Sequence, residues 1–217
     1  EYKDVLADPD IDAVHINTPI PNHAEHTLAA LRAGKHVACT VPMATSLEDC
    51  KAIVDLCQET GLHYMMMETA VYTRQHLYAQ ELKAAGALGR IYHFRAVYLQ
   101  EWIMPHYNTP MIWRLQKSEA GSGALGDLGA HIIDLGRYLV GDVKSVSAMA
   151  KTFTTQRPWA DGSGMGTVDV DDAFVAAVEF ENGALGTLEA TRFAAGRKNA
   201  LGLEINGEKG SIRFDLE

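Results

Sequence analysis

In the first third of the chain, the apolar positions alternate between short continuous runs and helical spacing. The run at residues 13–17 is typical of a short strand. Ala24, Leu28 and Leu31 then recur at the spacing of a helix, and Gly34 follows as its stop. Two further strands are expected at residues 37–39 and 63–67. Strands separated by helices of this length predict a parallel sheet.

Two more helices are expected from the same kind of pattern. Thr45, with Glu48 three residues later, has the spacing of a capping box and predicts the start of one helix, which Gly61 ends. Its apolar stripe is predicted to be Leu47, Cys50, Ile53, Val54 and Cys57. The other helix is predicted to carry Tyr78, Leu82 and Ala85 on its apolar face and to stop at Gly86.

Beyond residue 88 the pattern favours strands. Residues 91–99 predict one long strand, and residues 105–126 have no regular pattern. One amphipathic helix is marked by Leu128, Ile132, Leu135 and Leu139. Further strands are predicted at 145–152, 174–180, 185–191, 201–205 and 212–216, with an Asn182-Gly183 hairpin turn. We expect an α/β protein with a partial parallel sheet in residues 1–87 and an α+β domain with a large open, mostly antiparallel sheet in residues 88–217.

Charge and composition exclude several classes of function. The net charge is -9 and the basic residues are scattered, so the basic surface that nucleic acid or an anionic membrane requires is missing. No apolar run approaches the roughly 20 residues of a membrane-spanning helix, and the first residues are not typical of a signal peptide. We expect a cytoplasmic protein with no nucleic-acid or membrane partner, whose three cysteines are reduced thiols.

The two ends of the sequence are typical of a piece cut from a longer chain. There is no starting Met, residues 2–7 open in a short helical segment, and residues 211–217 close on a strand pattern. We expect a fragment in which the parallel sheet and the second domain are both incomplete.

Polar and proline-containing turns follow the three predicted parallel strands. In an open parallel sheet, ligands bind beyond the carboxyl ends of the strands. The segments that reach this edge are Asn17-Thr18-Pro19, Thr40-Val41-Pro42 and Glu68-Thr69. They predict a ligand-binding edge, although turns that merely end strands have the same composition.

Asp127 and His131 are the strongest candidates for catalysis. They are four residues apart at the start of the predicted amphipathic helix, so both side chains project from one face, opposite the apolar stripe. A carboxylate beside an imidazole is suited to general acid/base chemistry near neutral pH. The alternative is an Asp at a helix N-terminus with a solvated His nearby.

Glycines surround this pair. Gly123, Gly126 and Gly129 allow a cofactor or another backbone to approach the start of the helix closely. Residues 121–126 also match G-x-G-x-x-G, but the polar residues 114–119 precede them where the dinucleotide fingerprint requires an apolar strand. We therefore reject this segment as a dinucleotide-binding loop.

Four residues are candidates for substrate contacts. Trp113 and Arg114 offer an aromatic wall and a fixed cation for a sugar or phosphate, or they simply pack. Asp171 lies in an acidic cluster that either grips hydroxyl groups or forms a solvated turn, and Tyr72 completes the set. Residues 162–166 predict a mobile loop.

His23 and His26 have a three-residue spacing that is compatible with metal binding. No third ligand is evident in the sequence, and a polar helix face is the favoured interpretation. We therefore predict no metal site.

The order of the motifs resembles the glucose-fructose oxidoreductase / inositol dehydrogenase (Gfo/Idh/MocA) family. The segments that carry the resemblance are Asp12-Ala13-Val14, Thr18-Pro19, His23, Ala33-Gly34-Lys35-His36-Val37, residues 123–134, Val170-Asp171-Asp172-Ala173, Asn182-Gly183-Ala184 and Gly207-Glu208-Lys209-Gly210-Ser211. They cover essentially the whole chain, and their order and spacing together are specific.

This resemblance implies a Rossmann domain that binds NAD or NADP, followed by an α/β domain whose open sheet commonly builds oligomer contacts. It implies hydride transfer between the nicotinamide and a hydroxyl of a sugar, glycoside or cyclic polyol, and a homo-oligomer. By position, Thr18 and Pro19 would line the cofactor with His23 in the supporting turn, and Asn17, Thr40, Pro42 and Glu68 would lie at the same edge. Asp127 and His131 fall on the catalytic Asp and His of the family. The glycine-rich loop would lie upstream of residue 1.

One departure from the family pattern affects the chemistry. Members of the family usually carry Glu-Lys-Pro where this sequence has Thr40-Val41-Pro42, and Val41 cannot move a proton or hold a charge. His131 would then act alone as the base, oriented by Asp127, or Arg114 or another cation would replace the charge. Two other functions stay open: elimination, epimerisation or glycoside cleavage through a transient keto sugar, and a non-catalytic nucleotide- or sugar-binding module.

Overall fold

A computed structural model describes residues 1–68 and 73–217, and the predicted substrate residue Tyr72 lies outside them. The chain forms two compact units. The first unit holds residues 1–68 and 118–121, and the second holds the rest of the described chain. Among the described residues, no helix is long and apolar enough to cross a membrane. The three cysteines are free thiols, as predicted.

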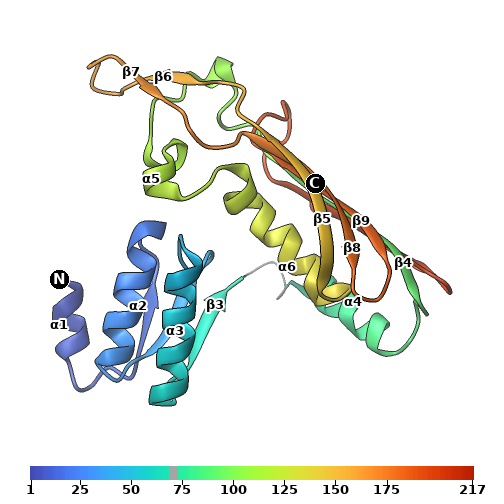
Figure 1. Cartoon of the computed structure of the whole chain (residues 1–217), viewed down its shortest axis with the longest axis horizontal. Coiled ribbons are helices and arrows are strands. Elements are labelled where there is room, and N and C mark those ends of the chain that lie inside the picture. Colours follow the sequence, from blue (N-terminus) through green and yellow to red (C-terminus); the bar gives the residue numbers. More distant parts are fainter. Residues whose placement is uncertain (69–72) are drawn as a thin grey trace. The chain divides into compact units, whose positions relative to one another are not determined.

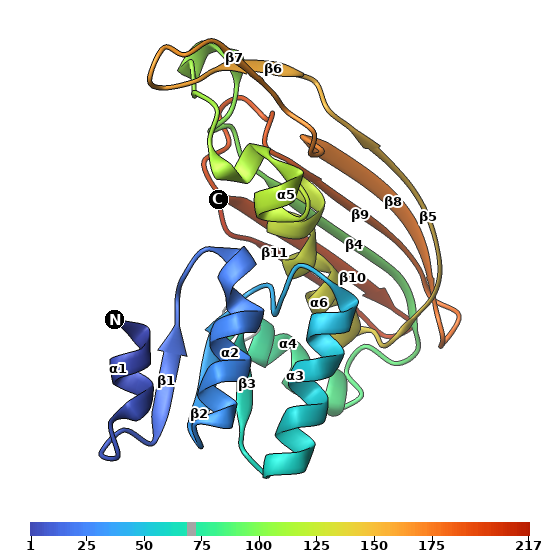
Figure 2. The same cartoon turned by 60° about the vertical axis from the view of Figure 1, so that its left-hand side comes forward.

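The first unit contains the predicted parallel sheet, with strand order β1-β2-β3. Its elements are α1 (Tyr2–Ala7), β1 (Ala13–Ile16), η1 (Ile20–Asn22), α2 (His23–Arg32), β2 (His36–Thr40), α3 (Leu47–Thr60) and β3 (Tyr64–Met67). Figure 2 shows α2 and α3 on one face of this sheet. The core between them is built from Ile16, Ala30, Leu31, Val37, Cys39 and Ile53.

The start and the packed face of α3 differ from the prediction. The helix is capped by Ser46, whose hydroxyl oxygen accepts a hydrogen bond from the Asp49 amide at 3.1 Å, so the predicted Thr45 cap is one residue early. Ser46 and Asp49 have the same three-residue spacing as Thr45 and Glu48, which is why the sequence allowed both starts. Leu47 is 63% and Val54 is 44% exposed, so the predicted stripe is wrong at these two positions. The last turn of α3 ends, as predicted, at Gly61, which has the left-handed conformation.

The second unit is built on a six-stranded sheet with the order β11-β10-β4-β9-β8-β5. Its strands are β4 (Ile91–Leu99), β5 (Val143–Lys151), β8 (Ala173–Phe180), β9 (Leu185–Thr191), β10 (Ala200–Gly207) and β11 (Ser211–Asp215). β4 and β9 are parallel, and the other neighbours are antiparallel. The prediction of a large, open, mostly antiparallel sheet is therefore confirmed.

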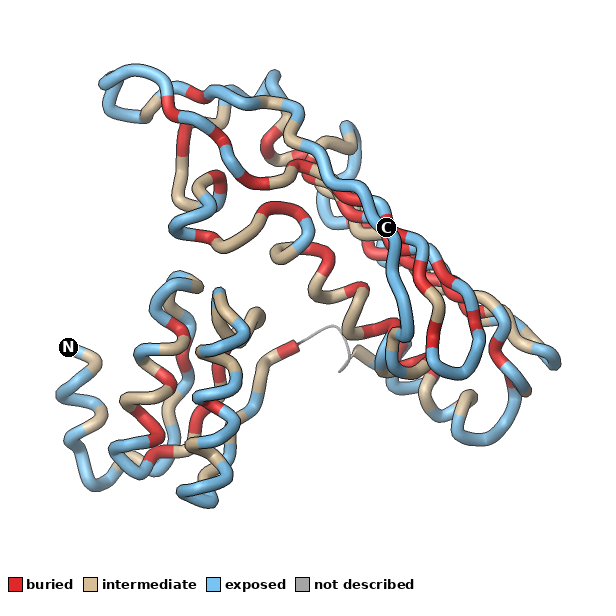
Figure 3. Tube along the Cα trace, in the orientation of Figure 1, coloured by how far each residue is buried: buried red, intermediate tan, exposed pale blue. Residues whose placement is uncertain are grey.

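Helix α6 (Ala130–Leu139) covers one face of this sheet (Figure 1). The predicted stripe Leu128, Ile132, Leu135 and Leu139 is buried against alternate residues of the strands, such as Phe174 and Val178. The residues between them in β8 point to the other face, where Val175 is exposed. Edge strand β5 is exposed along almost its whole length (Figure 3). The period of two in these strands thus separates a covered face from an open face.

Helix α4 (Arg74–Ala84) belongs to the second unit. It packs against α6, and the Lys83 ammonium donates to the Tyr138 carbonyl at 3.4 Å. Its buried residues are His76 and Ala79, whereas Tyr78 is 60% exposed, so the predicted stripe of this helix is wrong. Because α4 packs on the second unit, the chain divides after residue 68 and not at the predicted boundary between 87 and 88.

The segments predicted as irregular or mobile contain short regular elements. They are η3 (Pro105–Tyr107), η4 (Trp113–Leu115), α5 (Lys117–Ala120), η5 (Leu125–Gly129), β6 (Gln156–Pro158) and β7 (Met165–Thr167). β6 and β7 pair as an antiparallel hairpin, so residues 165 and 166 of the predicted mobile loop belong to a strand. A small core anchors this region: Ile103, Met111, Leu115, Val168 and Val170.

Candidate active site

The turns that follow β1 and β2 are joined by one buried histidine. The His23 side chain is 1% exposed, with Nδ1 2.8 Å from the Pro42 carbonyl oxygen and Nε2 2.8 Å from the Thr18 carbonyl oxygen. Because β1 and β2 are parallel, their carboxyl ends lie at one edge of the sheet. The structure therefore brings together three of the predicted cofactor residues: Thr18, His23 and Pro42.

The position of His23 requires an unusual protonation state. Each ring nitrogen faces a carbonyl oxygen at 2.8 Å, which only accepts hydrogen bonds, so both ring nitrogens must carry a proton. Burial opposes this charge, but hydrogen bonds to the Cys39 side chain and to the Pro42 and Thr18 carbonyls outweigh it and raise the pKa of His23 to about 9. A positive charge is thus fixed beneath the edge of the parallel sheet.

The other predicted cofactor residues lie along the same sheet. The Thr40 hydroxyl is 3.5 Å from the Ile16 carbonyl oxygen, a long contact between the ends of β2 and β1. Asn17 and Pro19 are exposed, and Glu68 is buried directly after β3. The polar helix face predicted for His23 and His26 is wrong for His23, which is buried, whereas His26 Nδ1 lies 3.3 Å from the Thr18 hydroxyl. In the described part of the chain, no group of three possible metal ligands occurs.

In the second unit, Asp127 lies in a π-helical turn, Leu125–Gly129, that leads into α6. Such turns are rare and are frequent at functional sites. The Asp127 carboxylate accepts a hydrogen bond at 2.8 Å from the guanidinium of Arg192, a residue that the sequence analysis missed. His131 lies in the first turn of α6, and its ring packs edge-on against Tyr98 with 5.6 Å between the ring centroids.

The start of this helical segment is held by Asp171. Its two carboxylate oxygens accept hydrogen bonds from the amides of Gly123 at 2.8 Å and Leu125 at 2.7 Å. These bonds give Asp171 a capping role at the start of the segment, and its predicted contact with substrate hydroxyls stays a prediction. The predicted close approach at Gly123 is to another backbone: a β-carbon there would be 1.8 Å from the Asp171 carbonyl oxygen.

Trp113 and Arg114 form a stacked pair in η4. The Arg114 guanidinium carbon lies 4.2 Å from the centre of the Trp113 ring, and the Arg114 side chain is exposed. The Arg114 carbonyl oxygen accepts a hydrogen bond from Arg192 at 3.4 Å. Arg192 therefore connects the predicted aromatic wall and cation with Asp127.

A row of polar side chains near His131 was also missed. Tyr98 lies in β4 and packs against the core under α6, and Gln100 and Trp102 follow at alternate positions beyond the strand. Trp102 Nε1 donates to Gln100 Oε1 at 2.9 Å, and Gln100 Nε2 donates to Asn199 Oδ1 at 2.7 Å. The signal was present in the sequence, because the period of two in the predicted strand continues from Ala96 to these three residues.

The segment that carries Asn199 is fixed by a buried carboxylate. Glu101 pairs with the Lys198 ammonium, and it accepts hydrogen bonds from the Tyr107 hydroxyl at 2.5 Å and the Gly196 amide at 2.6 Å. These bonds, that of Lys198 first, lower the pKa of Glu101 to about 2. Asn199 is thus presented beside Tyr98 and Gln100 from an anchored loop.

Comparison with known proteins places this geometry in a family. Residues 1–68 match the family described as "Oxidoreductase family, NAD-binding Rossmann fold", and residues 76–213 match the "GFO/IDH/MocA C-terminal domain". The chain belongs to the Gfo/Idh/MocA family of oxidoreductases, and the predicted family and fold class are confirmed.

Among its relatives is levoglucosan dehydrogenase of Pseudarthrobacter phenanthrenivorans, 41% identical over 100% of this chain and 58% of the relative. The 1,5-anhydro-D-fructose reductase of Ensifer adhaerens is 33% identical over 97% of this chain and 59% of that protein. A solved structure of levoglucosan dehydrogenase in complex with NADH and levoglucosan superposes with a TM-score of 0.94 at 43% identity, covering 99% of this chain and 57% of that one. The chain thus spans less than two thirds of the length of these relatives.

Proposed function

We propose that the full-length protein is an NAD(P)-dependent oxidoreductase that transfers hydride between the nicotinamide and a hydroxyl-bearing carbon of a sugar, glycoside or cyclic polyol. The observation that carries this proposal is the Asp127 carboxylate, fixed at 2.8 Å by buried Arg192 and one helical turn before His131. The similarity to a levoglucosan dehydrogenase and an anhydrofructose reductase supports the substrate class.

The edge of the parallel sheet fits the cofactor. Exposed Asn17 and Pro19 lie on turns whose backbone is fixed by the charged imidazole of His23, so this edge is rigid and accessible. The residues proposed to hold the cofactor are Asn17, Thr18, Pro19, His23, Thr40, Pro42 and Glu68. NAD is favoured because solved relatives were obtained with NADH. When bound, the nicotinamide supplies the two-electron acceptor or donor.

His131 is the proposed general base in the oxidation direction. Its imidazole takes the proton of the substrate hydroxyl as hydride leaves the same carbon. Asp127, held by Arg192, stabilises the positive charge that the imidazole then acquires. In the reduction direction, the same proton returns to the substrate oxygen.

The positive charge that a lysine at position 41 would have provided is assigned to Arg114. Its exposed guanidinium is stacked on Trp113, which limits its freedom and leaves its donors available to a substrate oxygen. Trp113 offers the apolar faces of a sugar ring a flat surface. These two residues form the proposed substrate contact of the second unit.

The absence of a lysine at Val41 favours one alternative function. A tightly held NAD would oxidise the sugar transiently, elimination, epimerisation or glycoside cleavage would follow next to the new carbonyl, and the same hydride would return. Product would then form without accumulation of NADH. Measurement of product and of NADH in the same reaction distinguishes this alternative from a net dehydrogenase.

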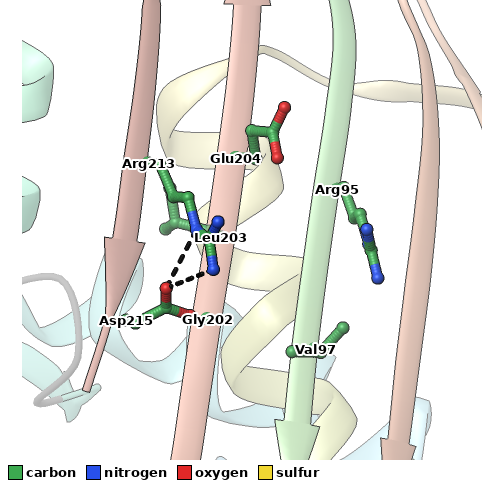
Figure 4. Close-up of a pocket in the computed structure, with 7 residues that line it drawn as sticks. All are labelled: Arg95, Val97, Gly202, Leu203, Glu204, Arg213 and Asp215. Atoms are coloured by element: carbon green, nitrogen blue, oxygen red, sulfur yellow. Dashed lines mark hydrogen bonds and ion pairs between the residues drawn. The ribbon is translucent and has the colours of Figure 1, made fainter. Parts of the chain in front are cut away.

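We propose a cytoplasmic homo-oligomer in which a second copy covers the open face of the sheet. This face is mixed in character: exposed Val175 and Leu185 lie on it together with charged residues of β4, β10 and β11. Figure 4 shows Arg95, Glu204 and Arg213 in front of the sheet and α6 behind it, with Arg213 bound to Asp215 at 2.9 Å. Light scattering of the full-length protein tests this assembly.

The activity is tested by absorbance of the reduced cofactor with full-length protein, NAD or NADP, and a panel of anhydrosugars, sugars and cyclic polyols. We expect reduced cofactor to accumulate with at least one of them and to vanish in His131→Ala. Product without reduced cofactor would instead identify the internal redox cycle.

A further inference from the structure

Arg192 is a charged residue in a core position. It follows β9 directly and continues the inward row of Leu188 and Ala190, and it is only 1% exposed. Placing a guanidinium in the interior costs several kcal/mol unless charge and hydrogen bonds compensate. The contacts of this side chain therefore require an explanation.

The Arg192 side chain touches three segments that are distant in sequence. Nη2 donates to Asp127 Oδ2 at 2.8 Å, and Nη1 donates to the Arg114 carbonyl oxygen at 3.4 Å. The guanidinium carbon also lies 5.4 Å from the centre of the Trp102 ring. One buried group thus fixes the catalytic carboxylate, the proposed substrate segment and an aromatic residue of the row near His131.

The ion pair is asymmetric. Arg192 is inaccessible, whereas the side chain of Asp127 is 30% exposed. The buried arginine cannot reach a substrate. It binds one oxygen of the Asp127 carboxylate from the inside and so fixes the partly exposed carboxylate in place. Asp127 Oδ2 is occupied by this bond, so the carboxylate has a defined orientation.

Stability alone explains this arrangement poorly. Apolar residues of similar volume often replace buried ion pairs without loss of stability. In addition, Arg192 Nε and the neighbouring Asp172 Oδ1 are buried without a hydrogen-bond partner among the described residues. A side chain selected only for packing would not leave such groups in the core.

We propose that Arg192 is a positioning residue of the reaction, and that it acts by orienting the Asp127 carboxylate. This inference rests on the function proposed above. Arg192 touches no reacting atom and acts through Asp127. Loss of Arg192 therefore has little further effect once Asp127 has lost its charge.

The test is a double-mutant cycle in the full-length protein, with Arg192→Met, Asp127→Asn and the double variant assayed for kcat and KM. We expect Arg192→Met to lower kcat on the order of 10²-fold, within the range of a general acid/base contribution. In the Asp127→Asn background, the same change should cost less than about threefold, because the two residues act as a unit. Arg192→Lys should retain more activity than Arg192→Met.

Arg137→Met is the matched control. Arg137 forms an exposed pair with Asp142 at 2.7 Å on the same helix as His131, and its loss should leave kcat unchanged. Thermal melts and NADH binding establish that each variant is folded. If Arg192→Met does not fold, the same double-mutant cycle is measured with Arg192→Lys in its place, alone and combined with Asp127→Asn.

The outcomes separate the two proposals. Equal losses from Arg192→Met in both backgrounds, or full activity of Arg192→Met, would overturn the positioning role while wild-type turnover still supports the proposed function. A wild-type protein that turns over no sugar, with or without net NADH formation, would overturn the proposed function itself.

Discussion

Gly123 lies against Asp171 so closely that a β-carbon on the glycine would be 1.8 Å from the Asp171 carbonyl oxygen. The Gly123 amide at the same time donates to the Asp171 carboxylate at 2.8 Å. This contact joins the start of the helical segment that carries Asp127 to the region before β8. The backbone there has no room to adjust without breaking the cap.

Gly123→Ala is expected to lower the free energy of unfolding by about 3 kcal/mol, at the upper end of overpacking effects. Activity should fall further than stability explains, because displacement of the helix start moves Asp127. Urea denaturation and kcat measure the two effects. The control is Gly210→Ala, since a β-carbon there would make only an ordinary contact of 3.6 Å with the Ala87 carbonyl oxygen. Equal stability of both variants would contradict the close contact.

Asp171→Ala tests the capping role against the substrate role predicted from the sequence. Loss of two hydrogen bonds to helix amides should destabilise the protein by about 1–2 kcal/mol, with KM for the sugar changed less than about threefold. Asp169→Ala is the graded control, because Asp169 accepts one amide bond among the described residues, from Lys117 at 2.6 Å. A large rise in KM with no loss of stability would support the substrate role.

The fold was predictable because its determinants are local. In residues 174–180, alternate apolar positions specify a strand with one covered face, and Asn182-Gly183 specifies the turn that follows. The shared face of Asp127 and His131 was inferred from their spacing in one helix and stays a prediction, because Asp127 lies in the π-helical turn Leu125–Gly129.

Partners that are distant in sequence were not predictable. An arginine after a strand is normally a surface residue, and only the folded chain brings Arg192 to Asp127, 65 positions away. Asp171 reaches Gly123 across 48 positions. The stripe of α4 failed for the same reason: His76 is buried because its ring packs edge-on against Phe214, with 4.7 Å between centroids. The spacing of apolar residues describes a single helix or strand, and it does not identify the distant segment that packs on it.

The stability of the protein should depend on pH through His23. Its pKa in the folded state, about 9, is raised above its ordinary value of 6.5. The charged form therefore stabilises the fold fully below about pH 6.5, and this contribution, on the order of 3 kcal/mol, is lost as the pH rises through about 9. We expect the free energy of unfolding of the wild type to fall over this range and that of His23→Gln to fall less.

Two measurements check the physical cause. NMR titration of the His23 ring should report its pKa directly, and Cys39→Ser should shift that pKa, because the Cys39 side chain is the first of the groups that raise it. Parallel stability curves for the wild type and His23→Gln would contradict a buried imidazolium.

Arg114→Met tests whether the Arg114 guanidinium supplies the positive charge that a lysine at position 41 would have provided. If the guanidinium stabilises charge that develops on the substrate oxygen, kcat and kcat/KM should both fall by about tenfold to a hundredfold. Stability should not change, since the side chain is exposed and the Arg192 bond is to the Arg114 carbonyl. Arg90→Met is the matched control, because Arg90 also stacks on an aromatic ring, that of Tyr92 at 5.4 Å. A rise in KM with unchanged kcat would limit Arg114 to binding, and full activity would leave His131, oriented by Asp127, to act as the base without a second cation.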